Sequence, residues 1–337
     1  MTAEPLLQVE DLHVQFWTNR GIVHAVNGIS FEVAAGETLG IVGESGCGKS
    51  VTSLALLGIL PRAGRVSGGR ALFGGENLFE LEDEQLRSIR GREIAMIFQD
   101  PMSSLNPVLT VGRQIREALE THLGMDEAKA NRRAAELLDQ VGIANPKMRL
   151  KDYPHQFSGG MRQRAMIAMA LACEPKLLIA DEPTTALDVT IQAQILDLLR
   201  ELVGQRETAL ILITHDLGVV AGMCERVNVM YAGTIVETGH ASRLFAQPRH
   251  PYTLGLLQSI PQLHSRVKQP LRPIRGAPRD MLSPPDHCPF APRCPNAIAT
   301  CVEHLPELEP VGPFQEAACF NTVAEDEWQR YKLQGAA

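Results

Sequence analysis

A glycine-rich loop constrains this chain more than any other sequence feature. It reads GESGCGKS from Gly43 to Ser50, between an apolar run at Thr38–Val42 and a helical pattern at Val51–Leu57. The pattern G-x-x-x-x-G-K-[ST] between a strand and a helix is that of a phosphate-binding loop. Glycines let the backbone curl so that its N–H groups face phosphate at a helix N-terminus. The sequence therefore predicts an α/β domain built around a phosphate site.

Two polar side chains at the end of this loop have expected roles. Lys49 is expected to neutralise the β- and γ-phosphate oxygens, and the hydroxyl of Ser50 is expected to bind Mg²⁺. Cys47 is a small neutral residue at a variable position, and we assign it no chemistry of its own. The segment predicted to contact ATP comprises Gly43, Ser45, Gly46, Cys47, Gly48, Lys49, Ser50 and Val51.

A second apolar run, Leu177–Ala180, ends in the two acids Asp181 and Glu182. Acids at this position are usually only the solvated end of a strand, but a phosphate-binding loop upstream favours a functional interpretation. Asp181 is then expected to hold Mg²⁺ through water. Glu182 is expected to orient and polarise the water that attacks the terminal phosphate.

Alternating strand and helix patterns continue as far as about Phe245 and indicate an α/β fold. An all-helical insert is expected after Pro101, where Val111–His122 and Asp126–Val141 have helical periodicity. Beyond Phe245 prolines accumulate, which disfavours long regular elements. We therefore expect a nucleotide-binding domain at 1–245, with a helical subdomain at about 101–165, and a C-terminal extension at 246–337. The other expected strands are Leu6–Phe16, Ser30–Val33, Thr38–Val42, Ile94–Phe98, Leu210–Thr214 and Val227–Tyr231.

Composition excludes some classes of protein. The 337 residues are 45% hydrophobic and carry a net charge of −7, so charge gives no support to a nucleic-acid or anionic-lipid partner. The longest apolar runs are far shorter than the ~20 residues of a membrane-spanning helix. The first residues lack the basic start and apolar core of a signal peptide. We expect a cytosolic chain whose contact with a membrane is peripheral.

A third motif identifies a family resemblance. The segment Phe157–Arg164 reads FSGGMRQR and resembles the LSGGQ signature of ABC ATPases, with Phe for the first Leu and Met for the usual Gln. Ser158, Gly159 and Gly160 are expected to open a helix at Met161–Leu171 and to present N–H groups and a hydroxyl to an anion. The resemblance implies that this anion is the γ-phosphate of ATP bound by the opposite subunit, so that only a dimer completes the site.

The other ABC motifs occur in the expected order. Gln99 resembles the Q-loop glutamine that binds Mg²⁺ and water, and His215 resembles the switch histidine that contacts the γ-phosphate. Residues 186–188 (ALD) resemble the D-loop, which includes Asp188, and Phe16 occupies the place of the aromatic that stacks on adenine. Alone, each would be an ordinary loop or packing residue. Their order supports a resemblance that covers roughly residues 5–245.

Three further segments resemble the ATPases of dipeptide, oligopeptide and nickel importers. They are Gln99–Pro107 (QDPMSSLNP), Pro248–Thr253 (PRHPYT) and Cys288–Pro295 (CPFAPRCP). This resemblance implies ATP hydrolysis that powers uptake of di- or oligopeptides, or of a related small cargo such as nickel. It also implies a second ABC ATPase subunit, expected to be a paralogue, two transmembrane permeases and an extracytoplasmic substrate-binding protein. The chain would then act at the cytoplasmic face of the cell membrane.

Four of the seven cysteines gather near the C-terminus with the spacing C-x5-C-x6-C-x17-C. This spacing differs from the C-x2-C pairs of zinc ribbons. Four thiolates suffice for a [4Fe–4S] cluster, and some relatives with this extension carry one. Zinc, with help from His287 or His304, and unmetallated structural thiols are alternatives that stay open. The four residues are Cys288, Cys294, Cys301 and Cys319.

Two other functions fit this sequence less well than a transport ATPase does. A soluble ABC ATPase of DNA repair or translation usually contains long coiled-coil insertions, zinc hooks or two cassettes joined by a basic linker, and this sequence contains none of them. A degenerate regulatory cassette without hydrolysis is opposed by the intact Glu182 and signature motif.

Overall fold

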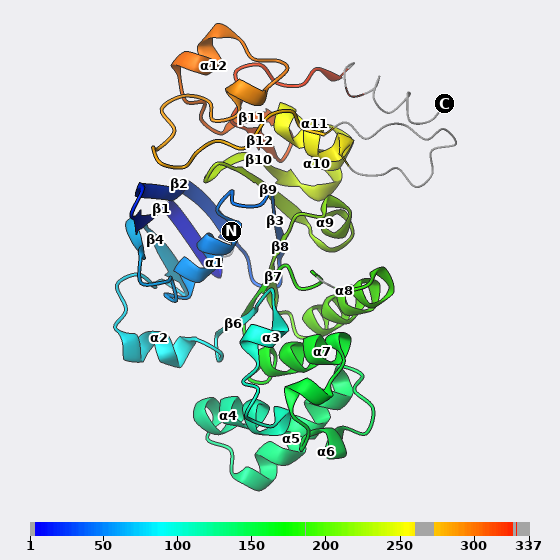
Figure 1. The fold of residues 1–337 in the computed structure, drawn as a ribbon. Helices are drawn as coiled ribbons and strands as arrows, with labels where there is room; N and C mark the ends of the chain where they lie inside the picture. Colours follow the sequence, from blue (N-terminus) through cyan, green and yellow to red (C-terminus); the bar gives the residue numbers. More distant parts are fainter. Residues whose placement is uncertain (1–3, 186, 260–272, 326–327, 329–337) are drawn as a thin grey trace, which may run out of the picture. The chain divides into compact units, whose positions relative to one another are not determined.

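The computed structural model describes residues 4–185, 187–259, 273–325 and 328 of the chain (Figure 1). It consists of two compact units. The first contains residues 1–6, 33–38 and 80–213, and the second contains residues 7–32, 39–79 and 214–337. Among the described residues, no helix has both the length and the apolar character that crossing a membrane demands.

The first unit is built on parallel strands. β6 (Ile94–Ile97), β7 (Leu177–Asp181) and β8 (Ala209–Thr214) lie in register, with Leu177 opposite both Ile94 and Ala209. Every residue of β7 and β8 is buried, which explains their almost continuous apolar sequence. The helices of this unit are α2 (Asp83–Ile89), α3 (Pro101–Ser104), α4 (Val111–Leu123), α5 (Glu127–Gln140), α6 (Pro146–Arg149), the 3₁₀ turn η1 (Pro154–Gln156), α7 (Gly159–Ala170) and α8 (Val189–Gly204).

The helices α4 and α5 begin within one residue of the positions that the sequence predicts. The hydroxyl of Thr110 accepts a hydrogen bond from the N–H of Arg113 at the start of α4. The carboxylate of Asp126 does the same for Lys129 at the start of α5, at 2.9 Å. These caps satisfy N–H groups that have no partner inside a helix. The helix α4 ends at Gly124, whose backbone is left-handed.

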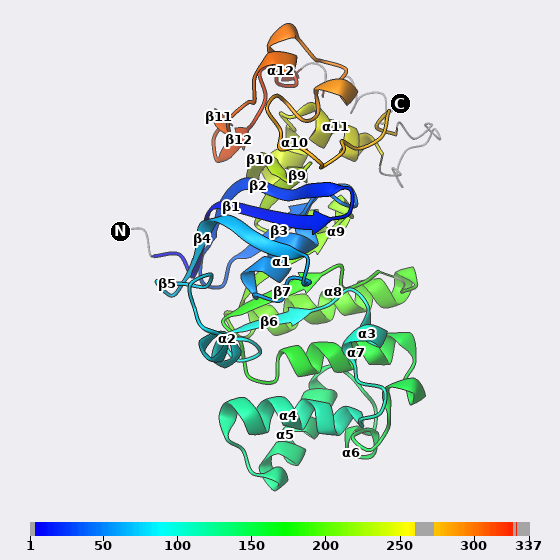
Figure 2. The same cartoon turned by 60° about the vertical axis from the view of Figure 1, so that its left-hand side comes forward.

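An antiparallel sheet forms one part of the second unit. Its strands are ordered β2-β1-β4-β5, with β1 at Leu7–Thr18, β2 at Gly21–Val33, β4 at Gly64–Phe73 and β5 at Glu76–Asn77 (Figure 2). The predicted first strand is confirmed. The second begins much earlier than the predicted Ser30, and β4 was not predicted at all. Two adjacent glycines, Gly68 and Gly69, weaken the strand pattern of β4, and pairing with β1 holds it extended.

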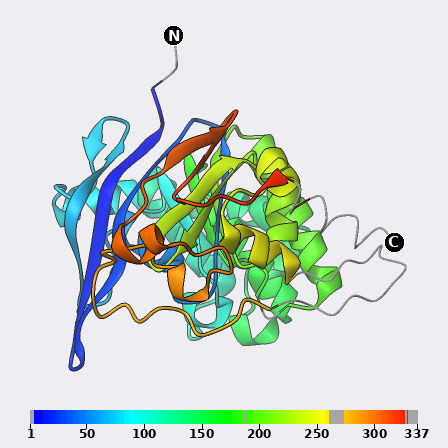
Figure 3. The ribbon, with the colours of Figure 1, turned by 90° about the horizontal axis from the view of Figure 1, so that it is seen from above.

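A second sheet of this unit joins the phosphate-loop strand to the C-terminal extension. β3 (Thr38–Val42) runs parallel to β9 (Arg226–Tyr231), and β10 (Thr234–His240) is antiparallel to β9. The short strands β12 (Gln315–Ala317) and β11 (Glu309–Gly312) extend this sheet beyond β10 (Figure 3). The helices here are α1 (Lys49–Leu56), α9 (Leu217–Met223) and α10 (Ala241–Ala246).

In its described residues, the extension is built of short elements, as its prolines predict. Besides β11 and β12, they include α11 (Pro251–Gln258), the 3₁₀ turn η2 (Ala291–Arg293) and α12 (Ala299–Glu303). A buried carboxylate, Glu237 of β10, ties the start of α11 and the strand β12 to the sheet. It accepts hydrogen bonds from the N–H groups of Arg249 and His250 and from the side-chain amide of Gln315. Burial raises the pKa of Glu237 and lowers the pKa of His250 to about 3. The imidazole of His250 is therefore neutral, and its Nδ1 accepts a hydrogen bond from the N–H of Tyr252.

Candidate nucleotide-binding site

The phosphate loop lies between the end of β3 and the start of α1, in the second unit. Close backbone approaches require glycine at two of its positions, Gly43 and Gly48. A Cβ at Gly43 would lie 2.2 Å from the carbonyl oxygen of Met230, and one at Gly48 would lie 2.5 Å from that of Ala25. Gly48 also has a φ of 106°, which side chains rarely adopt. The neighbouring strands therefore fix the shape of the loop and exclude larger residues at these points.

Gly48→Ala is expected to lower the free energy of unfolding by roughly 2–4 kcal/mol, because the new methyl group would overlap the backbone of β2. Gly46→Ala is the matched control: its φ is also positive, but no atom lies within 4 Å of its Cβ position. That variant should lose only about 1–2 kcal/mol, the cost of a left-handed alanine. Thermal and denaturant unfolding of both variants measure the difference. Equal losses would contradict the steric argument.

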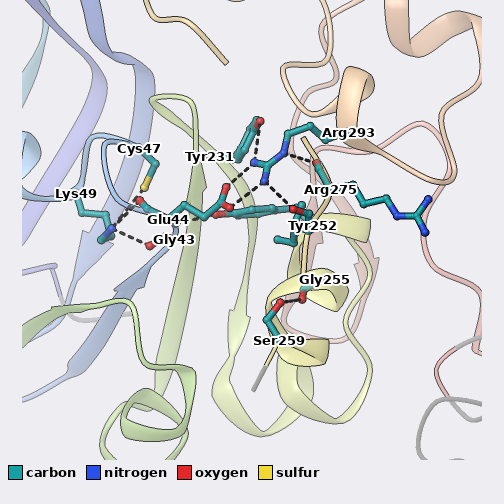
Figure 4. A network of polar contacts seen from close by, with 11 residues as sticks. Gly43, Glu44, Cys47, Lys49, Tyr231, Tyr252, Gly255, Ser259, Arg275 and Arg293 are labelled. Carbon is teal, nitrogen blue, oxygen red and sulfur yellow. Dashed lines mark hydrogen bonds and ion pairs between the residues drawn. The ribbon is translucent and has the colours of Figure 1, made fainter. Parts of the chain in front are cut away.

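Lys49 is buried in the loop that it closes. Its side chain is 5% exposed, and Nζ donates hydrogen bonds to the carbonyl oxygens of Gly43, at 2.8 Å, and Glu44, at 3.0 Å (Figure 4). The sulfur of Cys47 lies 3.7 Å from the same nitrogen. Burial raises the pKa of the Cys47 thiol, so this residue is neutral, as expected for a filler. Ser50 and Val51 follow in the first turn of α1.

Two other predicted residues of the second unit lie at strand ends. Phe16 is near the end of β1, and its ring packs against Gly64 of β4, where a Cβ would be 2.6 Å from Cε1. His215 follows β8 and is exposed. The next residue, Asp216, caps α9 by accepting hydrogen bonds from the N–H groups of Gly218 and Val219.

The acidic pair lies in the first unit, at the end of β7. Asp181 is buried as the last residue of the strand. Glu182 has a left-handed backbone with a φ of 45°, and its N–H donates to the carbonyl oxygen of Ile213 at 2.8 Å. A non-glycine residue at positive φ is uncommon, and such strained positions concentrate at functional sites.

Gln99 contacts Glu182 directly. Its side-chain amide donates to Oε2 of Glu182 at 3.1 Å, and the hydroxyl of Thr185 donates to the same oxygen at 2.8 Å. Gln99 follows β6, which runs parallel to β7, so the carboxyl ends of both strands meet at one edge of the sheet. The structure thus brings together two residues that are 83 positions apart and that were both predicted to act on the attacking water. Thr185 was not predicted.

The signature motif forms the tip of a helix. Ser158 caps α7, and its hydroxyl accepts a hydrogen bond from the N–H of Met161 at 3.3 Å. The helix begins at Gly159, two residues before the predicted start, and Ser158 and Gly159 are exposed. Asp188 caps α8 through the N–H of Ile191, and a Cβ at Gly160 would be 3.0 Å from that isoleucine. Ala186 of the predicted D-loop lies outside the described residues.

Comparison with known proteins identifies the family. A model described as ABC transporter matches residues 26–185, and one described as the C-terminal region of oligopeptide/dipeptide transporters matches residues 236–301. The chain is 56% identical to the dipeptide transport ATP-binding protein DppD of Bacillus subtilis (strain 168), over 88% of this chain and 89% of that protein. It belongs to the ABC transporter family. The oligopeptide transport ATP-binding protein OppD of Salmonella typhimurium is 54% identical to this ABC ATPase over 96% of both chains.

Solved structures confirm the α/β fold of this ABC ATPase. The dimeric post-hydrolysis structure of the ATP-binding cassette MJ0796 bound to ADP and Pi matches with a TM-score of 0.63 at 26% identity, over 70% of this chain and 98% of that chain. The structure of cbiO1 from Clostridium perfringens matches with a TM-score of 0.61 at 30% identity, over 72% of this chain and 91% of that chain.

The four cysteines of the extension lie near one another. The N–H of Cys288 donates to the carbonyl oxygen of Cys301. Burial raises the pKa of Cys319 to about 12, and the thiols of Cys288, Cys294 and Cys301 add to this rise. Across the described residues, however, no three His, Cys, Asp or Glu side chains are arranged to hold a metal ion. The predicted iron–sulfur or zinc site is therefore not supported by this arrangement of the thiols.

Proposed function

We propose that this chain is the ATP-hydrolysing subunit of an ABC importer for di- or oligopeptides. The contact between Gln99 and Glu182, beside the buried Asp181, is the observation that supports hydrolysis best. It accompanies an intact phosphate loop and an exposed signature helix tip. The peptide cargo is supported by the names of the relatives, which match over almost the whole chain, and by the match to the C-terminal region of peptide transporters.

In this proposal, each predicted residue has one role in ATP hydrolysis. Lys49 and the N–H groups of the loop bind the phosphates. Glu182 orients the attacking water and accepts its proton. Ser50, Asp181 and Gln99 offer the oxygen ligands that Mg²⁺ prefers and would hold this ion, which would neutralise charge on the β- and γ-phosphates. Phe16 stacks on the adenine, and His215 contacts the γ-phosphate.

A second ATPase subunit completes each site. Ser158, Gly159 and Gly160 donate hydrogen bonds to the γ-phosphate bound by the other subunit, and Asp188 lies at the same interface. We propose a paralogue as the partner, with residues 1–245 forming the cassette and residues 246–337 the extension. Closure of the two cassettes around ATP moves two transmembrane permeases, and hydrolysis resets them. A substrate-binding protein delivers the cargo from the other side of the membrane.

The chain would work as a peripheral subunit at the cytoplasmic face of the membrane, with no nucleic-acid partner. The alternative, a soluble ABC ATPase of DNA repair or translation, is not favoured by the relatives. ATP hydrolysis by the complete transporter in proteoliposomes tests the proposal. Binding protein loaded with a di- or oligopeptide is expected to stimulate hydrolysis several-fold. Stimulation by nickel alone would contradict the peptide cargo, and no hydrolysis with any cargo would contradict the function.

A metal or cluster bound by the four cysteines of the extension stays a prediction. We assign it no step in ATP hydrolysis. A [4Fe–4S] cluster agrees with the number of thiols, whereas their described arrangement forms no metal-binding group. The test is to measure the iron and acid-labile sulfide content of the full chain after anaerobic purification. About four of each per chain support the cluster. Zinc in place of iron, or no metal, would contradict it.

A further inference from the structure

Glu44, the second residue of the phosphate loop, forms an ion pair with Arg293 of the C-terminal extension. The guanidinium binds both carboxylate oxygens, with Nη1 2.5 Å from Oε2 and Nη2 2.9 Å from Oε1 (Figure 4). The Arg293 side chain is 5% exposed and that of Glu44 is 27% exposed. Two-pronged pairs of this kind are among the strongest and most directional polar contacts in proteins. The extension thus reaches the nucleotide loop itself.

Arg293 is held in place independently of Glu44. Its Nε donates to the carbonyl oxygen of Arg275 at 3.0 Å, and its Nη1 donates to the hydroxyl of Tyr231 at 3.3 Å. The guanidinium also lies 5.7 Å from the centre of the Tyr231 ring. The hydrogen bonds to Glu44 raise the pKa of Arg293, so the side chain stays charged. Because contacts with both Arg275 and Tyr231 fix its orientation, Arg293 can set the position of Glu44.

A second contact holds the backbone of the same loop residue. The N–H of Glu44 donates to the hydroxyl of Tyr252 at 2.8 Å, and Tyr252 is completely buried in α11. Its ring packs against those of Tyr231 and Phe290, with centroids 4.7 and 5.3 Å away. The carbonyl oxygen of Glu44 meanwhile accepts a hydrogen bond from Nζ of Lys49. All three polar groups of Glu44 are therefore engaged, two of them by the extension and one by the lysine that binds phosphate.

We propose that Arg293 is a positioning residue for ATP binding: by holding Glu44, it keeps the phosphate loop in place and neutralises a carboxylate beside the triphosphate. The C-terminal extension thereby sets the affinity of the chain for ATP. The inference rests on the proposed function only in that the loop binds ATP. Without Arg293, the loop would lose its bidentate anchor, and the free carboxylate would repel the phosphates. Both effects weaken ATP binding.

The test compares Arg293→Gln with Arg275→Gln in the full chain. Arg275 lies on the same segment, but it is exposed, its side chain points away from Glu44 in Figure 4, and only its backbone carbonyl takes part. Arg293→Gln is expected to raise the Kd for a fluorescent ATP analogue with Mg²⁺ about tenfold, or about 1.4 kcal/mol. In the complete transporter, KM for ATP should rise by the same factor while kcat changes less than about twofold. Arg275→Gln should match the wild type.

A double-mutant cycle tests whether Arg293 acts through Glu44. Glu44→Gln removes the carboxylate, so adding Arg293→Gln to it should weaken ATP binding no further. Additive losses would overturn the inference, as would a wild-type Kd in Arg293→Gln. Arg293→Lys keeps the charge without the two-pronged geometry and should raise Kd about threefold. If thermal melting shows that Arg293→Gln does not fold, Arg293→Lys decides in its place. Failure of the wild-type chain to bind ATP would instead refute the proposed function.

Discussion

Glu182→Gln is expected to lower ATP hydrolysis by about 100- to 10,000-fold while ATP still binds. Glutamine keeps the size of the side chain and can still accept hydrogen bonds from Gln99 and Thr185, but it cannot take a proton from water. The backbone of Glu182 is also held at a φ of 45° by its hydrogen bond to Ile213, so the substituted side chain should occupy the same place. The substitution therefore removes the group that accepts the proton and keeps the position of the side chain.

Two measurements check this expectation. Steady-state phosphate release gives the rate, and size-exclusion chromatography with ATP shows whether the two ATPase subunits stay together in the closed state. Glu207→Gln is the matched control, because Glu207 lies in the same unit, is exposed and also has a positive φ, of 51°. It should hydrolyse ATP like the wild type. Normal turnover in Glu182→Gln would remove Glu182 as the catalytic group.

Lys49→Ala is expected to raise the Kd for ATP about 100-fold or more, because a charge-assisted contact to phosphate is lost inside a largely buried loop. The carbonyl oxygens of Gly43 and Glu44 would also lose their hydrogen bonds from Nζ of Lys49. The oxygen of Glu44 would keep its hydrogen bond from the N–H of Cys47. Loss of the cation is therefore the main effect that acts against the nucleotide.

Isothermal titration calorimetry measures this loss directly. The shift of the melting temperature on adding ATP measures it independently, since a ligand stabilises the folded state in proportion to the logarithm of its concentration over Kd. Lys176→Ala is the control: that lysine is exposed and pairs with Glu93 at the surface, so ATP binding should be unchanged. An unaltered Kd in Lys49→Ala would contradict the assigned role of the loop.

Helix α8 was not predicted, although the local sequence contains the pattern of a helix. Its buried residues Ile195, Leu199, Leu202 and Val203 recur at helical spacing, and Asp188 is a favourable N-cap. Strand β4 is a different case. Its glycines argue for a loop, and only antiparallel pairing along β1, from Leu7 opposite Phe73 onward, makes it a strand. Such pairing depends on residues far away in the sequence and has no local pattern.

Local sequence patterns were sufficient for the phosphate loop, the helical insert, the buried parallel strands and the proline-broken extension. Each of these features depends on the chemistry or the steric limits of a few residues that are neighbours in the sequence. The contacts that bind these parts together came only with the folded chain. Gln99 meets Glu182 because two parallel strands end at one edge, and Glu44 meets Arg293 across 249 positions because the extension packs against the loop. Side-chain contacts over such separations are decided by packing, which no local pattern encodes.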